Sequence, residues 1–343
     1  MTTLTQLELI LPGALWPQLN TRAAIWQNQA LPALAKLYGA SRKSILPLRG
    51  RAAYLASLAG LAQLPAGPIL AAHYQAQTAT PLTAGYWLLA EPVHLRLERD
   101  HLTVLGEPYL ACQQAEAEAL VASLNGLYGA DGWQFIAISP SQWLLRLPAD
   151  PQLDFIPLDQ ALNRDLNEVL PAGPKALQFH ALLNEMQMLL YQHPVNDARD
   201  AAGQPLVHSV WLSGGGVYPA EQQMAMPAAL YADDVLLNAV GAQASVPGNF
   251  AAAQGLNISN ACVLLDDLRY PAIYGEGYQW QQIWLRWEAD WLAPALAALQ
   301  AGSLTELCLT LPDTGEQCRI RRGDLWRFWR RPALPIGPLT EEG

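Results

Sequence analysis

Residues 193–216 join three kinds of local structure, and this junction constrains the fold more than any other stretch. Apolar residues recur at helical spacing over 182–190, and 207–212 read as a buried strand. Three consecutive glycines, 214–216, then predict a tight turn that ends the strand. In open α/β sheets ligands sit beyond the carboxyl ends of strands, where glycines expose backbone N–H groups. The junction is therefore a candidate binding site.

The candidate ligand-binding residues of this junction are His193, Asn196, Arg199, Gly214 and Gly216. Asn196 is a versatile hydrogen-bonding residue, and the planar guanidinium of Arg199 suits a phosphate or a carboxylate. The functional interpretation is a loop that holds an anion. The structural alternative is a helix-to-strand connection that holds part of the fold together, and the local chemistry leaves both open.

Length and composition indicate a globular protein. The chain has 343 residues, of which 51% are hydrophobic and 15% charged, enough for about two domains with substantial cores. The net charge is −10, and the basic runs are no longer than the pairs at 321–322 and 330–331. Nucleic acid is therefore not an expected partner.

The cysteines and the hydropathy pattern bear on location. Cys112, Cys262, Cys308 and Cys318 are widely separated, without metal-ligand spacing, so we expect reduced thiols. No apolar run approaches the roughly 20 residues that span a bilayer, and no leader is recognisable at the first residue. The expectation is a cytoplasmic protein with no membrane partner and no cofactor.

The order of predicted elements gives an α/β body interrupted by a smaller α+β insertion. Strand-like runs at 7–11, 69–73 and 261–265 alternate with helical segments, whereas residues after 86 show short β runs and a hairpin. The predicted domains are a discontinuous α/β core of 1–85 and 207–331, an inserted domain of 86–206, and a disordered tail of 332–343.

Two further segments carry alternatives. Residues 279–299 form the longest predicted helix, with tryptophans at three- and four-residue spacing that indicate a core stripe rather than a ligand platform. Arg49 and Arg51 flank Gly50, where they either hold an anion or begin a solvated helix.

The run His-Pro-Val-Asn-x-x-Arg-x-x-x-Gly-x-Pro at 193–205, with Val-Trp-Leu-x-Gly-x-Gly at 210–216, resembles the archaeal-type cofactor-independent phosphoglycerate mutases of the alkaline phosphatase superfamily. Weaker likeness extends to 9–13, 31–37 and 313–314. The whole is also similar to the bacterial regulatory protein RpfE family. The resemblance implies an alkaline-phosphatase-like core sheet flanked by helices, and a phosphorylated three-carbon metabolite as a ligand.

The departures from this family concern its two-metal site. The resemblance implies an Asp-Gly after the first strand, a nucleophilic Ser, and later Asp and His ligands. Here 11–16 contain no carboxylate, Ser41 and Ser44 lack a recognisable context, and Thr314 stands at the late histidine position. We therefore expect no catalytic residues and no metal ligands.

Three hypotheses follow. The first is a non-catalytic, mutase-like regulatory or interaction protein that keeps an anion pocket. The second is an active phosphoglycerate mutase or metal-dependent phosphatase whose ligands lie among scattered acids and histidines. The third is a purely structural interaction module that uses its tryptophans. The candidate ligands of the second are Asp233, Asp234, Asp266, Asp267, Glu276, Asp313, His73, His94 and His101.

Overall fold

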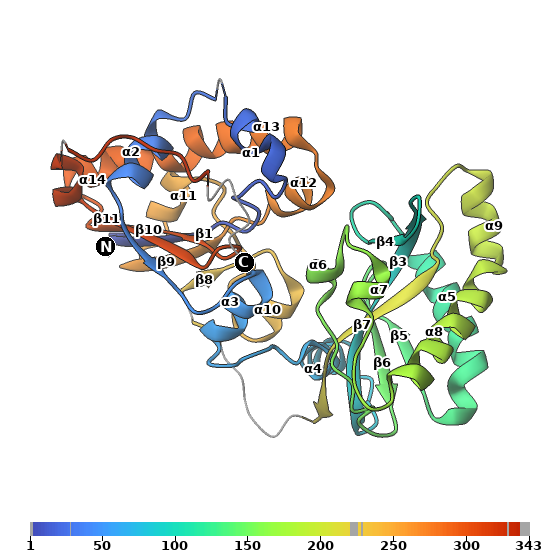
Figure 1. Cartoon of the computed structure of the whole chain (residues 1–343). Helices are drawn as coiled ribbons and strands as arrows, with labels where there is room; N and C mark the ends of the chain where they lie inside the picture. The colour runs from blue at the N-terminus through green and yellow to red at the C-terminus, as the bar shows by residue number, and fades with distance from the viewer. Residues whose placement is uncertain (1–2, 28, 220–225, 228, 328, 337–343) are drawn as a thin grey trace. The chain divides into compact units, whose positions relative to one another are not determined.

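The computed structural model describes residues 3–27, 29–219, 226–227, 229–327 and 329–336 (Figure 1). The chain divides into a core unit, 1–62 with 225–343, and an inserted unit, 63–224. This architecture confirms the α/β class that the sequence predicts, in which helices flank a core sheet and a smaller α+β unit is inserted.

The core unit is built on a mixed sheet of order β2-β11-β10-β1-β9-β8. β1 lies between β9 and β10 and is parallel to both, and β8 is parallel to β9. β11 and β2 extend the sheet by antiparallel pairing. The strands are β1 (Gln6–Ile10), β2 (Arg42–Ile45), β8 (Leu230–Tyr231), β9 (Asn260–Leu264), β10 (Glu306–Leu311) and β11 (Glu316–Arg321).

Helices lie on both faces of this sheet, with α2, α13 and α14 over one face and α3 and α10 on the other (Figure 1). Alternate residues of β1, Leu7 and Leu9, are buried in the main apolar core. The helical segments are α1 (Leu19–Ile25), α2 (Pro32–Ala40), α3 (Arg51–Leu58), α10 (Val235–Ala239), α11 (Phe250–Gln254), α12 (Arg269–Tyr274), α13 (Gly277–Trp287), the π-helix η2 (Glu288–Leu292), α14 (Ala293–Ala301) and the 3₁₀-helix η3 (Arg322–Trp326).

The long helix predicted at 279–299 is present as α13, η2 and α14 in succession. Its tryptophans, Trp280, Trp284, Trp287 and Trp291, are buried in the core. Their spacing therefore reports packing, and this stripe is not a surface for a partner.

The inserted unit has an antiparallel sheet in which β3 pairs with β4 and β6 and, separately, with β7. β5 extends the sheet beyond β6. Its elements are α4 (Ala66–Thr78), β3 (Gly85–Leu97), β4 (Leu102–Leu105), α5 (Gln114–Tyr128), the 3₁₀-helix η1 (Gly129–Asp131), β5 (Gln134–Ala137), β6 (Trp143–Leu147), α6 (Leu158–Ala161), α7 (Leu166–Val169), α8 (Ala176–Tyr191), α9 (Pro194–Ala201) and β7 (Ser209–Tyr218).

The predicted domain boundaries, after 85 and after 206, fall inside the inserted unit. Residues 69–73, predicted as a strand of the core, lie within α4, because a short apolar run fits a buried helix face as well as a strand. α4 packs on β3 and β7, so these elements belong with the insertion.

The predicted disordered tail is packed as far as the structure describes it. The Ala333 N–H donates to the Ala35 carbonyl of α2 at 3.0 Å, and Leu334 and Ile336 contact the core. Residues 337–343 lie outside the described residues.

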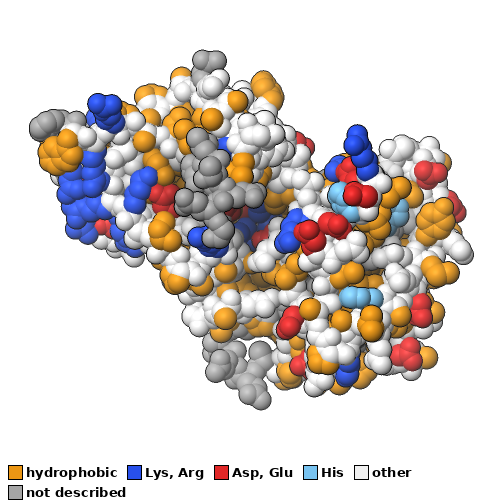
Figure 2. Space-filling view, in the orientation of Figure 1, with side chains coloured by type: hydrophobic (Ala, Val, Ile, Leu, Met, Phe, Trp, Pro, Cys, Tyr) orange, Lys and Arg blue, Asp and Glu red, His pale blue; other side chains and the backbone are white. Residues whose placement is uncertain are grey.

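Lys and Arg side chains gather at the edge of the core unit that carries β11 (Figure 2). The structure places Arg42 and Lys43 of β2 beside β11 through antiparallel pairing. Strand pairing thus brings cations from two distant segments of the chain to one edge.

Candidate functional site

The predicted binding residues His193 and Asn196 make hydrogen bonds within the inserted unit. The His193 Nδ1 accepts the Val195 N–H at 3.1 Å and so caps α9, and its Nε2 lies 3.0 Å from the Ser123 hydroxyl. The Asn196 amide donates to the Leu190 and Val207 carbonyls at 2.7 and 2.8 Å, and its Oδ1 accepts the Val207 N–H at 2.8 Å. Asn196 thus ties the end of α8 to the start of β7.

Arg199 is buried, with protein groups around its guanidinium. It donates to the Pro205 carbonyl at 2.7 Å, to the Glu116 carboxylate at 2.7 Å and to the Leu110 carbonyl. Glu116 also caps the amino terminus of α5 by accepting the Gln113 N–H at 2.8 Å. The anion that Arg199 holds is therefore a side chain of this protein.

Gly214 and Gly216 lie far from these three residues. β7 does not end at the glycines; it runs on to Tyr218, with an irregular register opposite β3. Asn196 contacts Val207, just before β7, whereas Gly216 is seven residues beyond Ser209, about 23 Å along an extended strand. No three-carbon ligand spans that estimated length, so the structure does not bring these five residues together around one small ligand.

The carboxyl edge of the core sheet is the stronger candidate site. The parallel strands β1, β9 and β10 end there together, followed by Gly13, Asp266 and Asp313. Asp313 accepts the Gly13 N–H at 2.8 Å. Gly13 has φ +74°, and a Cβ there would lie 2.6 Å from the Leu268 backbone, which explains the glycine. The edge is thus held by contacts between strand ends distant in sequence.

Arg51 brings two carboxylates together at this edge. It is the first residue of α3, held in place because the preceding Gly50 donates its N–H to the Pro312 carbonyl at 2.7 Å. Its guanidinium lies 3.1 Å from the Asp266 carboxylate and also pairs with Asp234. The Arg269 guanidinium also lies near the Asp266 carboxylate, at 3.4 Å. Two arginines and two carboxylates thus form one network.

The environment of Asp234 keeps it ionised. Burial, the largest single effect, would raise the pKa of this carboxyl, but Arg51, the Leu237 N–H and Arg269 together outweigh burial, and the net pKa is lowered. Asp234 also caps α10 by accepting the Leu237 N–H at 3.0 Å. Both of its roles need the charged form.

This donor set does not fit the two divalent metals that the family resemblance implies. A metal pair needs carboxylates that face one another across a space for the cations. Here the Arg51 guanidinium lies between Asp234 and Asp266. Across the described ranges no group of three or more His, Cys, Asp or Glu side chains is placed to hold a metal ion.

The candidate ligands are divided between the two units. His73, His94 and His101 belong to the inserted unit, whereas the candidate acids belong to the core unit. Asp267 pairs with Arg286 at 2.9 Å. The sequence marks Arg51 as a candidate for anion binding, because it is an arginine at the start of a helix. That local signal does not identify the anion.

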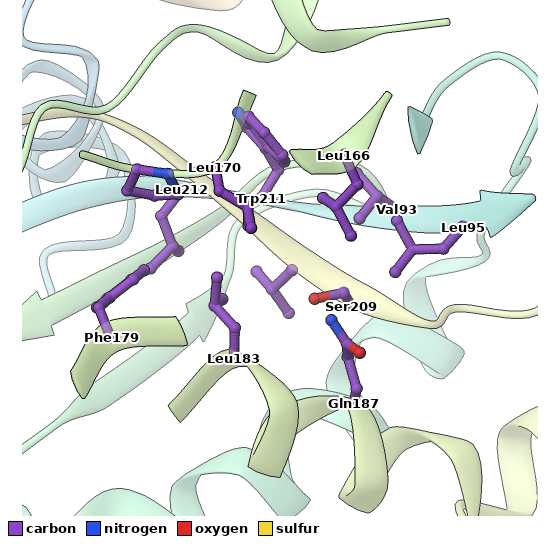
Figure 3. Close-up of a pocket in the computed structure, with 12 residues that line it drawn as sticks. Val93, Leu95, Leu166, Leu170, Phe179, Leu183, Gln187, Ser209, Trp211 and Leu212 are labelled. Carbon is purple, nitrogen blue, oxygen red and sulfur yellow. The ribbon is translucent and has the colours of Figure 1, made fainter. Parts of the chain in front are cut away.

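The inserted unit has a pocket between α8 and the sheet (Figure 3). Apolar side chains line most of it, including Val93, Leu183 and Trp211, with Ser209 and Gln187 near one another at one end. No Lys or Arg is among its lining residues. Its chemistry suits an apolar group and not a phosphorylated metabolite.

In the part of the chain that the structure describes, every helix is too short or too polar to cross a bilayer.

Comparisons with known proteins concern the fold. No protein-family model matches the chain, and no curated protein matches it. The structure of a cofactor-independent phosphoglycerate mutase from Thermoplasma acidophilum is similar, with 13% identity and a TM-score of 0.41, over 98% of this chain and 94% of that one. The PH0037 protein from Pyrococcus horikoshii is similar with 13% identity and a TM-score of 0.45, over 93% and 87%.

Proposed function

We propose that this chain is a non-catalytic, mutase-like protein with a regulatory or interaction role. The observation that supports it is the position of Arg51 between Asp234 and Asp266. A regulatory role is also the one that the sequence resemblance to the RpfE family implies.

The physical reason is charge compensation. Carboxylates at a sheet edge repel one another, and either bound cations or nearby arginines can stabilise them. Arg51 and Arg269 supply two positive charges to Asp234 and Asp266, so the charges of these four side chains balance. A divalent metal would have to displace a guanidinium and bring two like charges together.

The predicted anion pocket at Arg199 is left out of this proposal. A phosphorylated metabolite would have to compete with Glu116 for a guanidinium that is 2% exposed. We propose instead that His193, Asn196 and Arg199 hold α9 against α5, α8 and β7, which is the structural alternative to anion binding.

The test is metal content and turnover. Protein purified without chelator is measured by mass spectrometry for bound metal, and 3-phosphoglycerate is supplied with Mn²⁺ in a mutase assay. We expect neither stoichiometric metal nor turnover, and no calorimetric response to 3-phosphoglycerate. Bound metal with turnover would overturn the proposal.

A second candidate is an active mutase or phosphatase, and the placement of Asp266 and Asp313 at the ends of β9 and β10 favours it. This candidate predicts that Asp266→Asn abolishes any turnover observed. Asp150→Asn, which changes an exposed acid of the inserted unit, is the matched control. Turnover that survives Asp266→Asn would exclude this site as its source.

A further inference from the structure

The edge of the core unit formed by β2, β11 and η3 carries an excess of positive charge, although the chain has a net charge of −10. Eight cationic residues lie on these elements or just after η3. Three acidic residues lie among them, of which Glu306 belongs to the neighbouring strand β10. We call this surface the basic edge. Its cations are Arg42, Lys43, Arg319, Arg321, Arg322, Arg327, Arg330 and Arg331, and its acids are Glu306, Glu316 and Asp324.

The acids lie beneath the cations. The Asp324 side chain is fully buried and lies 2.9 Å from the guanidinium of Arg42 and 3.2 Å from that of Arg327. Glu306 is nearly buried and pairs with Arg321 at 2.6 Å, while the Arg321 side chain is 64% exposed. The buried acids therefore orient the cationic side chains, and the charge exposed to solvent at this edge is mainly positive.

Large apolar side chains are exposed among these cations. Trp326 at the end of η3 is 74% exposed, Trp329 is 66% exposed, and Ile45 of β2 is 67% exposed. Leu325, next to Trp326, packs on the core and anchors η3. Exposed tryptophans held on an anchored segment indicate a contact surface.

β2 is poorly suited to pairing with a strand of another protein. It is a four-residue edge strand that carries Arg42 and Lys43, and short, charged edge strands resist pairing with another chain. Tryptophan beside arginine is instead the composition found where proteins meet the headgroup region of a bilayer. Anionic lipids attract each nearby Lys or Arg, and they repel the remaining, strongly acidic surface.

We propose that the basic edge docks the core unit on an anionic phospholipid surface, with Trp326 and Trp329 entering the headgroup region and the cations contacting lipid phosphates. The protein binds at the surface and does not span it. This inference is independent of the proposed function, because it uses no residue of the Arg51 network.

The test uses the full-length protein and vesicles of phosphatidylcholine alone or mixed equally with phosphatidylglycerol. Flotation should recover the protein with the anionic vesicles only, and added salt should release it. Arg322→Glu and Trp326→Ala, both at exposed positions, should each weaken binding by about tenfold or more.

Arg286→Glu on α13 is the matched control, because it makes the same charge change at a 54% exposed arginine outside the basic edge. Its binding should equal that of the wild type. The proposal is overturned if anionic vesicles do not bind, or if Arg286→Glu weakens binding as much as Arg322→Glu. Binding of single-stranded RNA or polyglutamate without vesicle binding would assign the edge to another polyanion and overturn the lipid assignment.

Discussion

The guanidinium of Arg51 lies 3.1 Å from the carboxylate of Asp266, although 215 residues separate them in the chain. Both side chains are largely buried, and Asp234 completes the group. The pair fixes the start of α3 against the end of β9. It also occupies the edge where an α/β protein would normally bind a ligand.

Replacing Arg51 tests this network. Arg51→Ala leaves Asp234 and Asp266 close together without their shared cation, so the free energy of unfolding should fall by about 2–4 kcal/mol. Urea denaturation measures it. Arg286→Ala, which breaks the exposed pair with Asp267, should cost less than about 1 kcal/mol. Equal losses would contradict the role assigned to Arg51. Metal binding gained by Arg51→Ala would support that role, because the guanidinium then takes the place of a bound cation.

Arg199 offers a test of structural role against anion binding. Lysine keeps the charge but cannot reach Glu116, Leu110 and Pro205 together, so Arg199→Lys should lower the free energy of unfolding by about 2–4 kcal/mol. The control is Arg164→Lys at an exposed pair, which should change it by less than about 0.5 kcal/mol. If 3-phosphoglycerate raised the melting temperature of the wild type but not of Arg199→Lys, the pocket interpretation would be restored.

His208 should make stability depend on pH. Burial lowers its pKa from 6.5 to about 4, with a contribution from neighbouring His94, and its Nδ1 accepts the Leu95 N–H at 3.0 Å. The unfolded chain therefore binds a proton that the folded chain does not, so stability falls as pH decreases from 6.5 towards about 4.

The free energy of unfolding should fall by about 2 kcal/mol between pH 6.5 and about pH 4. This is less than the full pKa shift would give, because the imidazole ring is partly exposed to solvent. Denaturant titrations at several pH values measure it. His208→Gln should flatten this part of the profile, whereas His73→Gln should not. An unchanged profile in His208→Gln would assign the pH dependence to other groups.

Gly214 should tolerate no side chain. Its φ is +57°, and a Cβ would lie 2.6 Å from the Ala66 Cβ and 2.8 Å from the Ala66 nitrogen at the start of α4. Gly214→Ala should therefore cost about 2–4 kcal/mol of unfolding free energy, from backbone strain and overpacking.

Gly203 is the matched control for that substitution. It has φ +66°, and a Cβ there would meet nothing within 4 Å, so Gly203→Ala should cost only about 1 kcal/mol. Thermal unfolding of both variants gives the comparison. Similar shifts in melting temperature would mean that the contact with α4 contributes nothing.

Several elements could be read from the sequence because their signals are local. The tryptophan spacing along 279–299 predicted a buried helix face, and Trp280 and Trp284 are in the core. The alternation of strands and helices predicted the α/β class. Residues 69–73 were misassigned because a run of apolar residues alone does not distinguish a buried strand from a buried helix.

The glycines at 214–216 show a second limit. Glycine permits a tight turn, but it also permits a strand to pass close to a helix. The close approach of Gly214 to Ala66 of α4 shows that Gly214 serves the packing of a strand against a helix, and only the tertiary structure reveals that contact. Likewise, an arginine at the start of a helix predicts an anion without naming it. For Arg51 and Arg199 the anions are carboxylates of this chain.

The sequence by itself determined the α/β class, the buried tryptophan face and the lack of a carboxylate after the first strand, because periodicity and residue type act over short distances. Only the tertiary structure decided the partners of Arg51 and Arg199 and the gathering of Arg42 with Arg321 at one edge. Those pairings join residues far apart in the chain, and electrostatic energy depends on distance in space rather than along the chain.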